Sequence, residues 1–268
     1  MNANTEANNP ASLKSVDFLQ VLKDQGHFPK SVPTIEAPPL VGIEGTTILA
    51  LRYKDGVMVA GDRRATMGNT VVYDRADKVL TIDDCAVMAL SGSPGMAYEI
   101  ARVLEMSFQH HRRSQLQELS IDGKLRLLSR LLRDNLPMAM QGIGAVIPIF
   151  AAYDEDAASG KIFFCDILGA QFESVDFCTT GSGSPIIRGA LYYLNRWGVS
   201  PFAAMSMDEA LELIVKMLET AAEYDTATGG FRREAQIFPQ VIRVTAAGLE
   251  TVAEEELAAL YANGIVGD

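Results

Sequence analysis

The chain has few cysteines and few histidines, three of each in 268 residues. Cys85, Cys165 and Cys178 are far apart and lie in apolar, strand-like stretches, so we expect buried free thiols in a reducing cytosol rather than disulfides. His110 and His111 end a predicted helix beside two arginines, and the sequence offers them no third ligand. We therefore expect no metal, no cofactor and no histidine-based catalytic triad.

Positive charge is also in short supply, because 23 Lys and Arg stand against 34 Asp and Glu, for a net charge of −11. An acidic chain is a poor match for phosphate backbones and anionic lipids, so neither nucleic acid nor a membrane is expected as a partner. No apolar run approaches the roughly 18 residues of a membrane span, and the N-terminus lacks the features of a secretory signal. A cytoplasmic protein with one large domain is expected.

The sequence pattern changes once, at Gly45. Residues 1–45 hold five of the eleven prolines, and only Leu13–Leu22 has a helical apolar stripe. Such a segment buries too little apolar surface to fold by itself, although it could dock onto a partner surface. We expect 1–45 to be a propeptide that is removed on maturation, and 46–268 to be the folded catalytic domain.

Blocks of strands alternate with pairs of helices after Gly45, which predicts stacked antiparallel sheets with helix layers outside them. The first helix opens at Ser93-Pro94, and the second is expected to stop near Pro137. Further helices are predicted at 185–196, 207–223 and 253–262. Strands are predicted at 46–52, 56–62, 70–73, 78–82, 86–91, 145–153, 161–168, 175–179 and 237–245.

An apolar run that opens on threonine follows Gly45, as Thr46-Thr47-Ile48-Leu49-Ala50-Leu51. A threonine at a chain start carries a nucleophilic hydroxyl and a general base, its free α-amine, on the same residue. That amine has a pKa of about 7.7–8.0, so a large fraction of it is an unprotonated base at neutral pH. Cleavage between Gly45 and Thr46 would create such a terminus, so the catalytic site is predicted there.

Asp62 and Lys78 follow Thr46 at two successive steps of sixteen residues. The Asp55-Gly56 pair between two apolar runs predicts a β-hairpin. If its turn centres on Lys54, residue 62 lies opposite residue 46. A lysine ammonium lowers the pKa of a neighbouring hydroxyl, and a carboxylate holds the lysine in place. Taken singly, Asp62 would be a turn cap and Lys78 a solvated lysine, but their placement with Thr46 favours catalysis.

These residues resemble the β subunits of the 20S proteasome, and within them the bacterial, actinobacterial type with a long propeptide. The resemblance runs from about residue 45 to about residue 245 and rests on an ordered set of motifs rather than on any one of them. The motifs are Gly45-Thr46-Thr47-Ile48, Gly61-Asp62-Arg63-Arg64-Ala65-Thr66, Lys78, Ser91-Gly92-Ser93, Gly181-Ser182-Gly183-Ser184 and Asp225-Thr226-Ala227-Thr228-Gly229-Gly230.

The resemblance implies the α+β, four-layer αββα sandwich of N-terminal-nucleophile hydrolases and an autocatalytically processed threonine endopeptidase. Thr46 would be nucleophile and amine base, with Asp62 and Lys78 beside it, and it would also cleave its own bond to Gly45. The amide of Gly92 would form the oxyanion hole, although a glycine there also suits an ordinary turn. Residues implied to assist the amine are Ser182, Asp225 and Thr228.

The Gly-rich string at 181–184 could, taken alone, cradle a phosphate at a helix start, but it lacks the lysine of a Walker loop. Many of the resembling proteins carry serine where Thr228 stands, and threonine keeps the hydroxyl. The resemblance further implies a pocket for the substrate side chain before the cleaved bond. Its expected lining residues are Ala65, Thr66, Ala76, Leu90, Pro94 and Tyr98.

The implied partners are proteasome α subunits, other β subunits in seven-membered rings and an ATP-dependent unfoldase ring on the α side. The implied substrates are unfolded proteins and peptides, cut inside the ring-stacked chamber. Two alternatives stay open. A non-catalytic structural β subunit is one, although Thr46, Asp62 and Lys78 are all present. An HslV-type peptidase is the other, although that group is shorter and lacks so long a leader.

Overall fold

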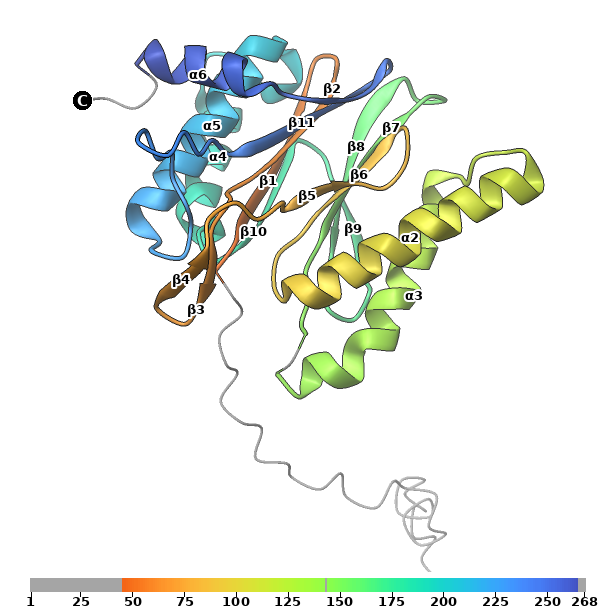
Figure 1. Cartoon of the computed structure of the whole chain (residues 1–268). Helices are drawn as coiled ribbons and strands as arrows, with labels where there is room; N and C mark the ends of the chain where they lie inside the picture. Colours follow the sequence, from red (N-terminus) through yellow and green to blue (C-terminus); the bar gives the residue numbers. More distant parts are fainter. Residues whose placement is uncertain (1–44, 143, 265–268) are drawn as a thin grey trace, which may run out of the picture. The chain divides into compact units, whose positions relative to one another are not determined.

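The computed structural model describes residues 45–142 and 144–264 (Figure 1). The helix predicted at Leu13–Leu22 lies outside the described residues. One five-stranded antiparallel sheet has the strand order β10-β1-β2-β11-β12. Its strands are β1 (Thr47–Tyr53), β2 (Gly56–Gly61), β10 (Phe177–Gly181), β11 (Gln240–Thr245) and β12 (Gly248–Thr251).

A second antiparallel five-stranded sheet has the order β5-β6-β7-β8-β9. Its strands are β5 (Val79–Thr81), β6 (Ala86–Ala89), β7 (Ile149–Asp154), β8 (Ser159–Cys165) and β9 (Gln171–Ser174). A separate two-stranded hairpin consists of β3 (Ala65–Met67) and β4 (Thr70–Tyr73).

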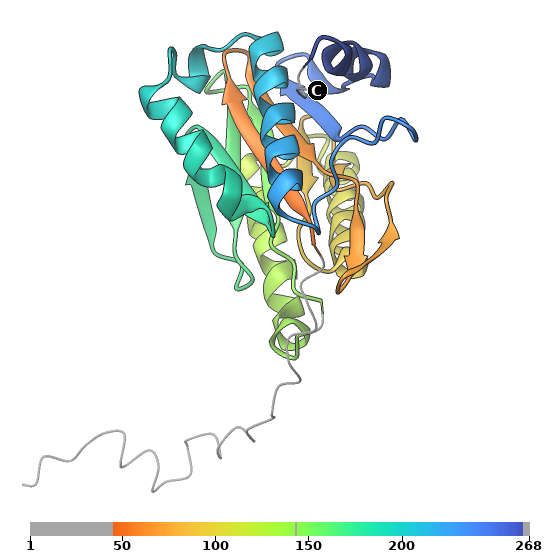
Figure 2. The same cartoon turned by 90° about the vertical axis from the view of Figure 1, so that its left-hand side faces the viewer.

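Helices cover the outer face of each sheet, as Figures 1 and 2 show. Helices α2 (Pro94–Gln115) and α3 (Ile121–Met140) pack on the second sheet. Helices α4 (Ser184–Trp197), α5 (Met207–Tyr224) and α6 (Glu254–Ala262) pack on the first, together with a short 3-10 helix at 202–204. The layers therefore run helix, sheet, sheet, helix.

Three buried apolar clusters hold these four layers together, one at each junction. Strand β1 contributes to two of them, because successive side chains of a strand point to opposite faces. Leu49 and Leu51 join the cluster under α4 and α5, whereas Ile48 and Ala50 join the cluster between the sheets. This explains why the strand is apolar at each position from Ile48 to Leu51: both of its faces are covered there.

Several element boundaries differ from those predicted. Pro137 lies inside α3, which continues to Met140. A proline inside a helix lacks the N–H that would bond the carbonyl four residues before it, and its ring crowds that carbonyl, but in α3 it does not end the helix. Strands β3, β9 and β12 were not predicted, because each has only three or four residues and no clear alternation. Cys165 and Cys178 are buried free cysteines, as predicted, but Cys85 is partly exposed.

Candidate active site

The hairpin of β1 and β2 sets the geometry of the site. Tyr53 pairs with Gly56 and Ile48 pairs with Gly61, so the turn has two residues and its centre falls between Lys54 and Asp55. The prediction that the turn centres on Lys54 was therefore wrong by half a residue. The consequence is that Asp62 follows the strand opposite Thr47 rather than Thr46, since a change of register moves every cross-strand partner.

Asp62 lies at the centre of the site and is fully buried. Its Oδ1 accepts hydrogen bonds from the Thr47 amide at 2.8 Å and from Lys78 Nζ at 2.6 Å. Its Oδ2 accepts from the amides of Arg64 at 2.9 Å and Gly229 at 2.8 Å. An ionised carboxylate has about four acceptor sites, so this arrangement satisfies the buried charge.

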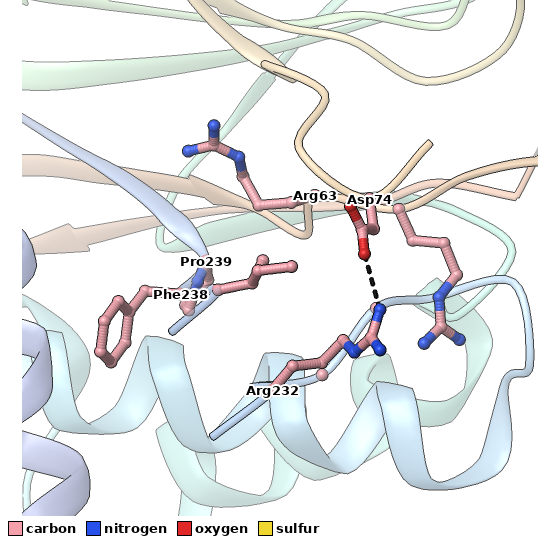
Figure 3. A pocket seen from close by; sticks show the side chains of 9 residues that line it. Arg63, Asp74, Arg232, Phe238 and Pro239 are labelled. Carbon is pink, nitrogen blue, oxygen red and sulfur yellow. Dashed lines mark hydrogen bonds and ion pairs between the residues drawn. The ribbon is translucent and has the colours of Figure 1, made fainter. Parts of the chain in front are cut away.

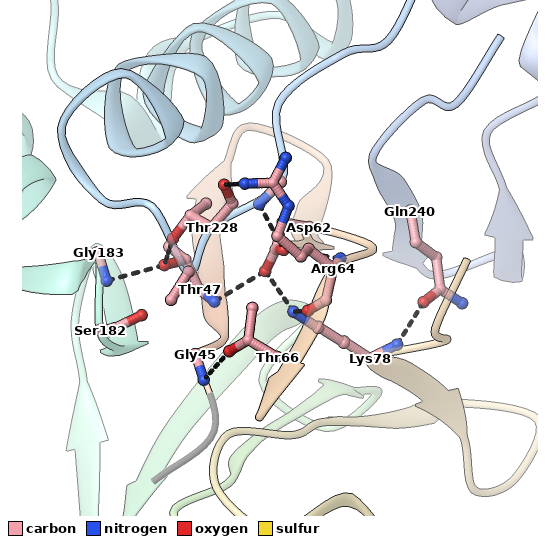
Figure 4. Close-up of polar contacts among 12 residues, drawn as sticks. Gly45, Thr47, Asp62, Arg64, Thr66, Lys78, Ser182, Gly183, Thr228 and Gln240 are labelled. Atoms are coloured by element: carbon pink, nitrogen blue, oxygen red, sulfur yellow. Dashed lines mark hydrogen bonds and ion pairs between the residues drawn. The ribbon is translucent and has the colours of Figure 1, made fainter. Parts of the chain in front are cut away.

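Lys78 reaches Asp62 from the segment just before β5 and has only 6% of its side chain exposed (Figure 4). Its Nζ also donates to the carbonyl of Arg64. Gln240, the first residue of β11, fixes the lysine backbone by accepting from the amide of Lys78 at 2.9 Å. Burial lowers the pKa of Lys78 below its ordinary value, and the neighbouring Asp62 only partly offsets that effect. The Lys78 side chain is thus fixed by two acceptors, and Asp62 is the carboxylate that pairs with it.

A second polar group lies at the end of β10 and the loop after α5. Ser182 Oγ donates to Asp225 Oδ2 at 2.5 Å, and Thr228 Oγ1 donates to the same oxygen at 2.5 Å. The amide of Ser182 donates to the carbonyl of Thr46 at 2.9 Å. Thr47 joins the two groups of the site, because its amide contacts Asp62 while its Oγ1 lies 2.6 Å from Thr228 Oγ1.

Thr46 stands between these two polar groups, immediately before β1, and is 6% exposed. It lines a small pocket together with Lys78 and Gly92. The preceding Gly45 packs closely against Ala227. A Cβ added to Gly45 would lie 1.8 Å from the Cβ of Ala227. Only glycine fits at this position without moving its neighbours.

Gly92 follows β6 and has a φ of 101°, a conformation that L residues with a side chain rarely adopt. A Cβ there would also lie 2.1 Å from the carbonyl oxygen of Ala145. Gly92 forms an isolated antiparallel bridge with Val146. The two hydrogen bonds of this bridge come from the amides of Ser93 and Ile147, so the Gly92 N–H is not one of them. Gly92 lines the same pocket as Thr46.

Most of the expected substrate-pocket residues lie around the same cavity as Thr46. Thr66 does not line it: the side chain of Thr66 is buried and its Oγ1 accepts from the amide of Gly45 at 3.2 Å. Asp77 lines the cavity and was not predicted; its carboxylate is 3.2 Å from Arg63. The predicted residues that do line the cavity are Ala65, Ala76, Leu90, Pro94 and Tyr98.

A separate hollow lies nearby and contains none of the predicted site residues (Figure 3). It is rich in arginine, but these cations have partners: Arg232 forms an ion pair with Asp74 at 2.6 Å. Arg64 donates from its guanidinium to the carbonyls of Thr226 at 2.9 Å and Thr228 at 3.1 Å. Arg64 therefore supports the 226–228 loop behind Asp62. Arg232 is already paired with Asp74 and is not a free cation for a ligand.

Besides Asp77, sequence reasoning missed Arg64, Thr47 and Gln240 as residues of the site. The sequence gives only a weak indication of the role of Arg64. An aspartate side chain commonly accepts from the amide two residues later, as Asp62 does here from Arg64. Thr47 was treated only as part of the apolar run, since the hairpin register was wrong. Gln240 has no local signal at all, because it contacts Lys78 across 162 residues of sequence.

Within residues 45–142 and 144–264, no three His, Cys, Asp or Glu side chains converge to hold a metal ion. The helices described here include none that is both long and apolar enough to cross a bilayer.

An αββα sandwich with a buried threonine just before a central strand is the architecture of the N-terminal-nucleophile hydrolases, which defines the class of this protein. A family model described as "Proteasome subunit" matches residues 43–233. The chain is 44% identical over 216 residues to "Proteasome subunit beta 2" of Thermomonospora curvata, covering 81% of this chain and 75% of that one. It is 37% identical over 247 residues to "Proteasome subunit beta" of Streptomyces griseus subsp. griseus, covering 90% and 85%.

The chain therefore belongs to the proteasome subunit family, as a β subunit, and is a threonine protease. This confirms the resemblance to actinobacterial β subunits and the predicted fold class. Membership also implies assembly with other proteasome subunits.

Proposed function

We propose that the mature enzyme begins at Thr46, whose hydroxyl attacks the peptide bonds of protein and peptide substrates, and that residues 1–45 are a propeptide. The observation that carries the proposal is the position of Thr46 on one small cavity with Lys78 and Gly92. A nucleophile, a cation and an unused backbone amide thus meet at one place where a carbonyl can bind.

Thr47 is the competing nucleophile, and its contacts argue against it. It has 0% exposure and does not line the cavity. Its Oγ1 accepts from the amide of Gly183 at 2.9 Å and lies 2.6 Å from Thr228 Oγ1. A hydroxyl engaged on two sides inside the core cannot approach a substrate carbonyl, whereas Thr46 faces the cavity.

The reaction then proceeds through an acyl-enzyme ester. The hydroxyl of Thr46 adds to the substrate carbonyl as its own α-amine takes the proton, with Lys78 stabilising the developing alkoxide. The Gly92 amide donates to the oxyanion. The protonated amine gives its proton to the leaving amine of the substrate, and water then hydrolyses the ester by the same route. Ser182, Asp225 and Thr228 are proposed to orient the amine.

Maturation uses the same hydroxyl against the carbonyl of Gly45. The scissile residue is held by the hydrogen bond from its amide to Thr66 Oγ1, which suggests that Thr66 positions the propeptide junction. Until the bond breaks, the amine of Thr46 is part of a peptide bond and cannot act as a base, so the precursor is inactive. The intact mass of the purified protein tests the proposal: it should correspond to a chain that starts at Thr46, and a terminus at Met1 in active particles would contradict it.

We further propose that the chain assembles into two stacked seven-membered β rings flanked by rings of α subunits, with an ATP-dependent unfoldase ring on the α side. The three free cysteines suit the reducing cytoplasm in which we place this particle. Large apolar side chains on the β3–β4 hairpin are exposed, with Val72 at 59% and Tyr73 at 56%, which is typical of surfaces that a partner covers.

Co-expression with the cognate α subunit is expected to give a particle of hundreds of kilodaltons. Head-to-tail contacts between subunits close into rings, and in a closed ring each contact surface is covered by a neighbour. Light scattering coupled to size-exclusion chromatography measures this mass. A stable monomer with full peptidase activity would contradict the ring proposal.

The cavity beside Thr46 predicts a preference for large apolar or aromatic residues before the cleaved bond. Ala65 and Ala76 leave room, Leu90 and Pro94 make the walls apolar, and burying an unpaired charge there is costly. An apolar side chain gains roughly 1.5–3 kcal/mol on burial, which biases kcat/KM by about ten-fold or more. Comparing kcat/KM for fluorogenic peptides ending in Tyr, Leu, Arg and Glu measures this preference.

Asp77 provides the control for that measurement, because it is the acidic residue on the cavity and Arg63 already pairs with it. The Asp77→Asn variant should leave the ranking of Tyr and Leu over Arg unchanged. A clear preference of the wild-type enzyme for Arg that disappears in Asp77→Asn would overturn the apolar assignment and identify Asp77 as the specificity residue.

A further inference from the structure

Thr47 connects the two polar halves of the site. On the backbone side it exchanges hydrogen bonds with Asp62: the Thr47 amide donates to Oδ1 at 2.8 Å, and the Asp62 amide donates to the Thr47 carbonyl at 3.1 Å. On the side-chain side, its hydroxyl contacts Gly183 and Thr228. Arg64 also contacts both residues, but it reaches only the backbone carbonyl of Thr228. Among the described residues, Thr47 is the one that contacts both Asp62 and the hydroxyl of Thr228.

The donors of this network can be assigned from the number of protons. Thr228 has one hydroxyl proton and donates it to Asp225 Oδ2 at 2.5 Å. In the 2.6 Å contact between Thr47 and Thr228, the donor is therefore Thr47. Because Thr47 Oγ1 also accepts from the amide of Gly183 at 2.9 Å, its hydroxyl is satisfied on both sides.

The result is a one-way chain of hydrogen bonds from the Gly183 amide through Thr47 and Thr228 to the carboxylate of Asp225. Such chains polarise each member and strengthen one another at low local dielectric. Ser182 donates its proton to the same carboxylate oxygen at 2.5 Å. Its lone pairs thus remain as acceptors for an N–H of the mature amine of Thr46, whose carbonyl already accepts from the Ser182 amide at 2.9 Å.

We propose that Thr47 is a positioning residue whose hydroxyl sets the orientation of Thr228, Asp225 and Ser182, and through them the general-base amine of Thr46. This inference rests on the proposed function of Thr46. It assigns a role in the rate of the chemical step to the second residue of the mature chain, distinct from its place in the core of the sheet.

The space around the hydroxyl leaves little room for a substitute. A Cβ added to Gly183 would lie 2.5 Å from Thr47 Oγ1 and 2.9 Å from Thr228 Oγ1. Water therefore cannot replace a lost hydroxyl without moving the loop. Valine has nearly the same shape as threonine, so Thr47→Val removes the hydrogen bonds while it keeps the strand and its packing.

The test compares Thr47→Val with Thr47→Ser in the full chain, co-expressed with the cognate α subunit and assembled. Mass spectrometry gives the fraction of chains that start at Thr46, and kcat is expressed per processed chain. Thr47→Val should lower kcat by about ten-fold, the value of one lost network interaction, with KM within about two-fold of wild type. Thr47→Ser should restore kcat. The acidic limb of the kcat profile should move to higher pH in Thr47→Val, because a less satisfied Asp225 carboxylate favours the ammonium form of the amine.

Thr220→Val is the matched control, because Thr220 lies on α5 and its hydroxyl bonds only the helix carbonyl of Lys216 at 2.7 Å. It should leave kcat and the pH profile unchanged. Thr228→Val should show the same loss as Thr47→Val, and the double variant should be no worse than either single one, since both interrupt the same chain. If Thr47→Val does not assemble, Thr47→Ala, which also lacks the hydroxyl, takes its place in the comparison with Thr47→Ser.

Wild-type kcat and pH dependence in Thr47→Val, or in Thr228→Val, would overturn the positioning role. That outcome is distinct from failure of the proposed function, which would appear as an active Thr46→Ala variant. A mature terminus at Thr47 would overturn both, because Thr47 would then be the nucleophile itself.

Discussion

Changing Thr46 to alanine is expected to abolish both removal of the propeptide and hydrolysis of peptides, with a loss in kcat/KM on the order of 10³-fold or more. The variant lacks the only hydroxyl that faces the cavity from the chain start, and without it no acyl-enzyme can form. The fold should be retained, because Thr46 precedes β1 and an alanine side chain fits within the space of threonine. Mass spectrometry of the terminus and a fluorogenic peptide assay measure the two effects.

Thr46→Ser is the matched control, because it keeps the hydroxyl and removes only a methyl group. It should still process its propeptide and turn over substrate, at a reduced rate. Unchanged circular dichroism and assembly of Thr46→Ala would show that the loss is chemical. Undiminished turnover by assembled Thr46→Ala would refute the assignment of the nucleophile.

Changing Lys78 to alanine is expected to reduce activity nearly as much, by at least about 10²-fold, because the alkoxide of Thr46 loses its cation. This variant should also be destabilised, since Asp62 would remain fully buried without its partner at 2.6 Å. Breaking a buried ion pair costs about 3–5 kcal/mol, and the low end applies here because three backbone amides still donate to Asp62. Thermal unfolding and single-turnover kinetics separate the two effects.

Two further variants make the Lys78 experiment specific. Lys78→Arg keeps the charge, but its planar head cannot reproduce the compact contacts with Asp62 and the Arg64 carbonyl, so it should be folded and slow. Lys161→Ala removes a partly exposed lysine of β8 that pairs with Glu173 of β9 at 2.9 Å. It should leave activity unchanged and alter stability by no more than about 0.5 kcal/mol. Full activity in Lys78→Ala would show that the lysine has only a structural role.

The stacking of antiparallel sheets between helix layers was predictable because its main signals are local, whereas the specific fold class was implied by the resemblance. The apolar runs of β1 and β2, the Ser93-Pro94 helix start and the helical stripes each act over a few residues. Boundaries were less predictable where a tertiary contact decides them. Helix α3 continues past Pro137 as far as Met140, and the short edge strand β9 forms only because β8 offers it hydrogen bonds.

The positions of Thr46, Asp62 and Lys78 in the chain, and the apolar run that follows Gly45, were enough to predict where the site lies and which chemistry it suits. The contacts between those residues depend on the folded structure. A two-residue turn, instead of one centred on Lys54, places Thr47 and not Thr46 opposite Asp62. Gln240 and Asp225 reach the site from distant segments. Local patterns determine which helices and strands form. Hydrogen bonds between residues more than a hundred positions apart become possible only when the sheets have stacked, because the buried polar groups must then find partners away from water.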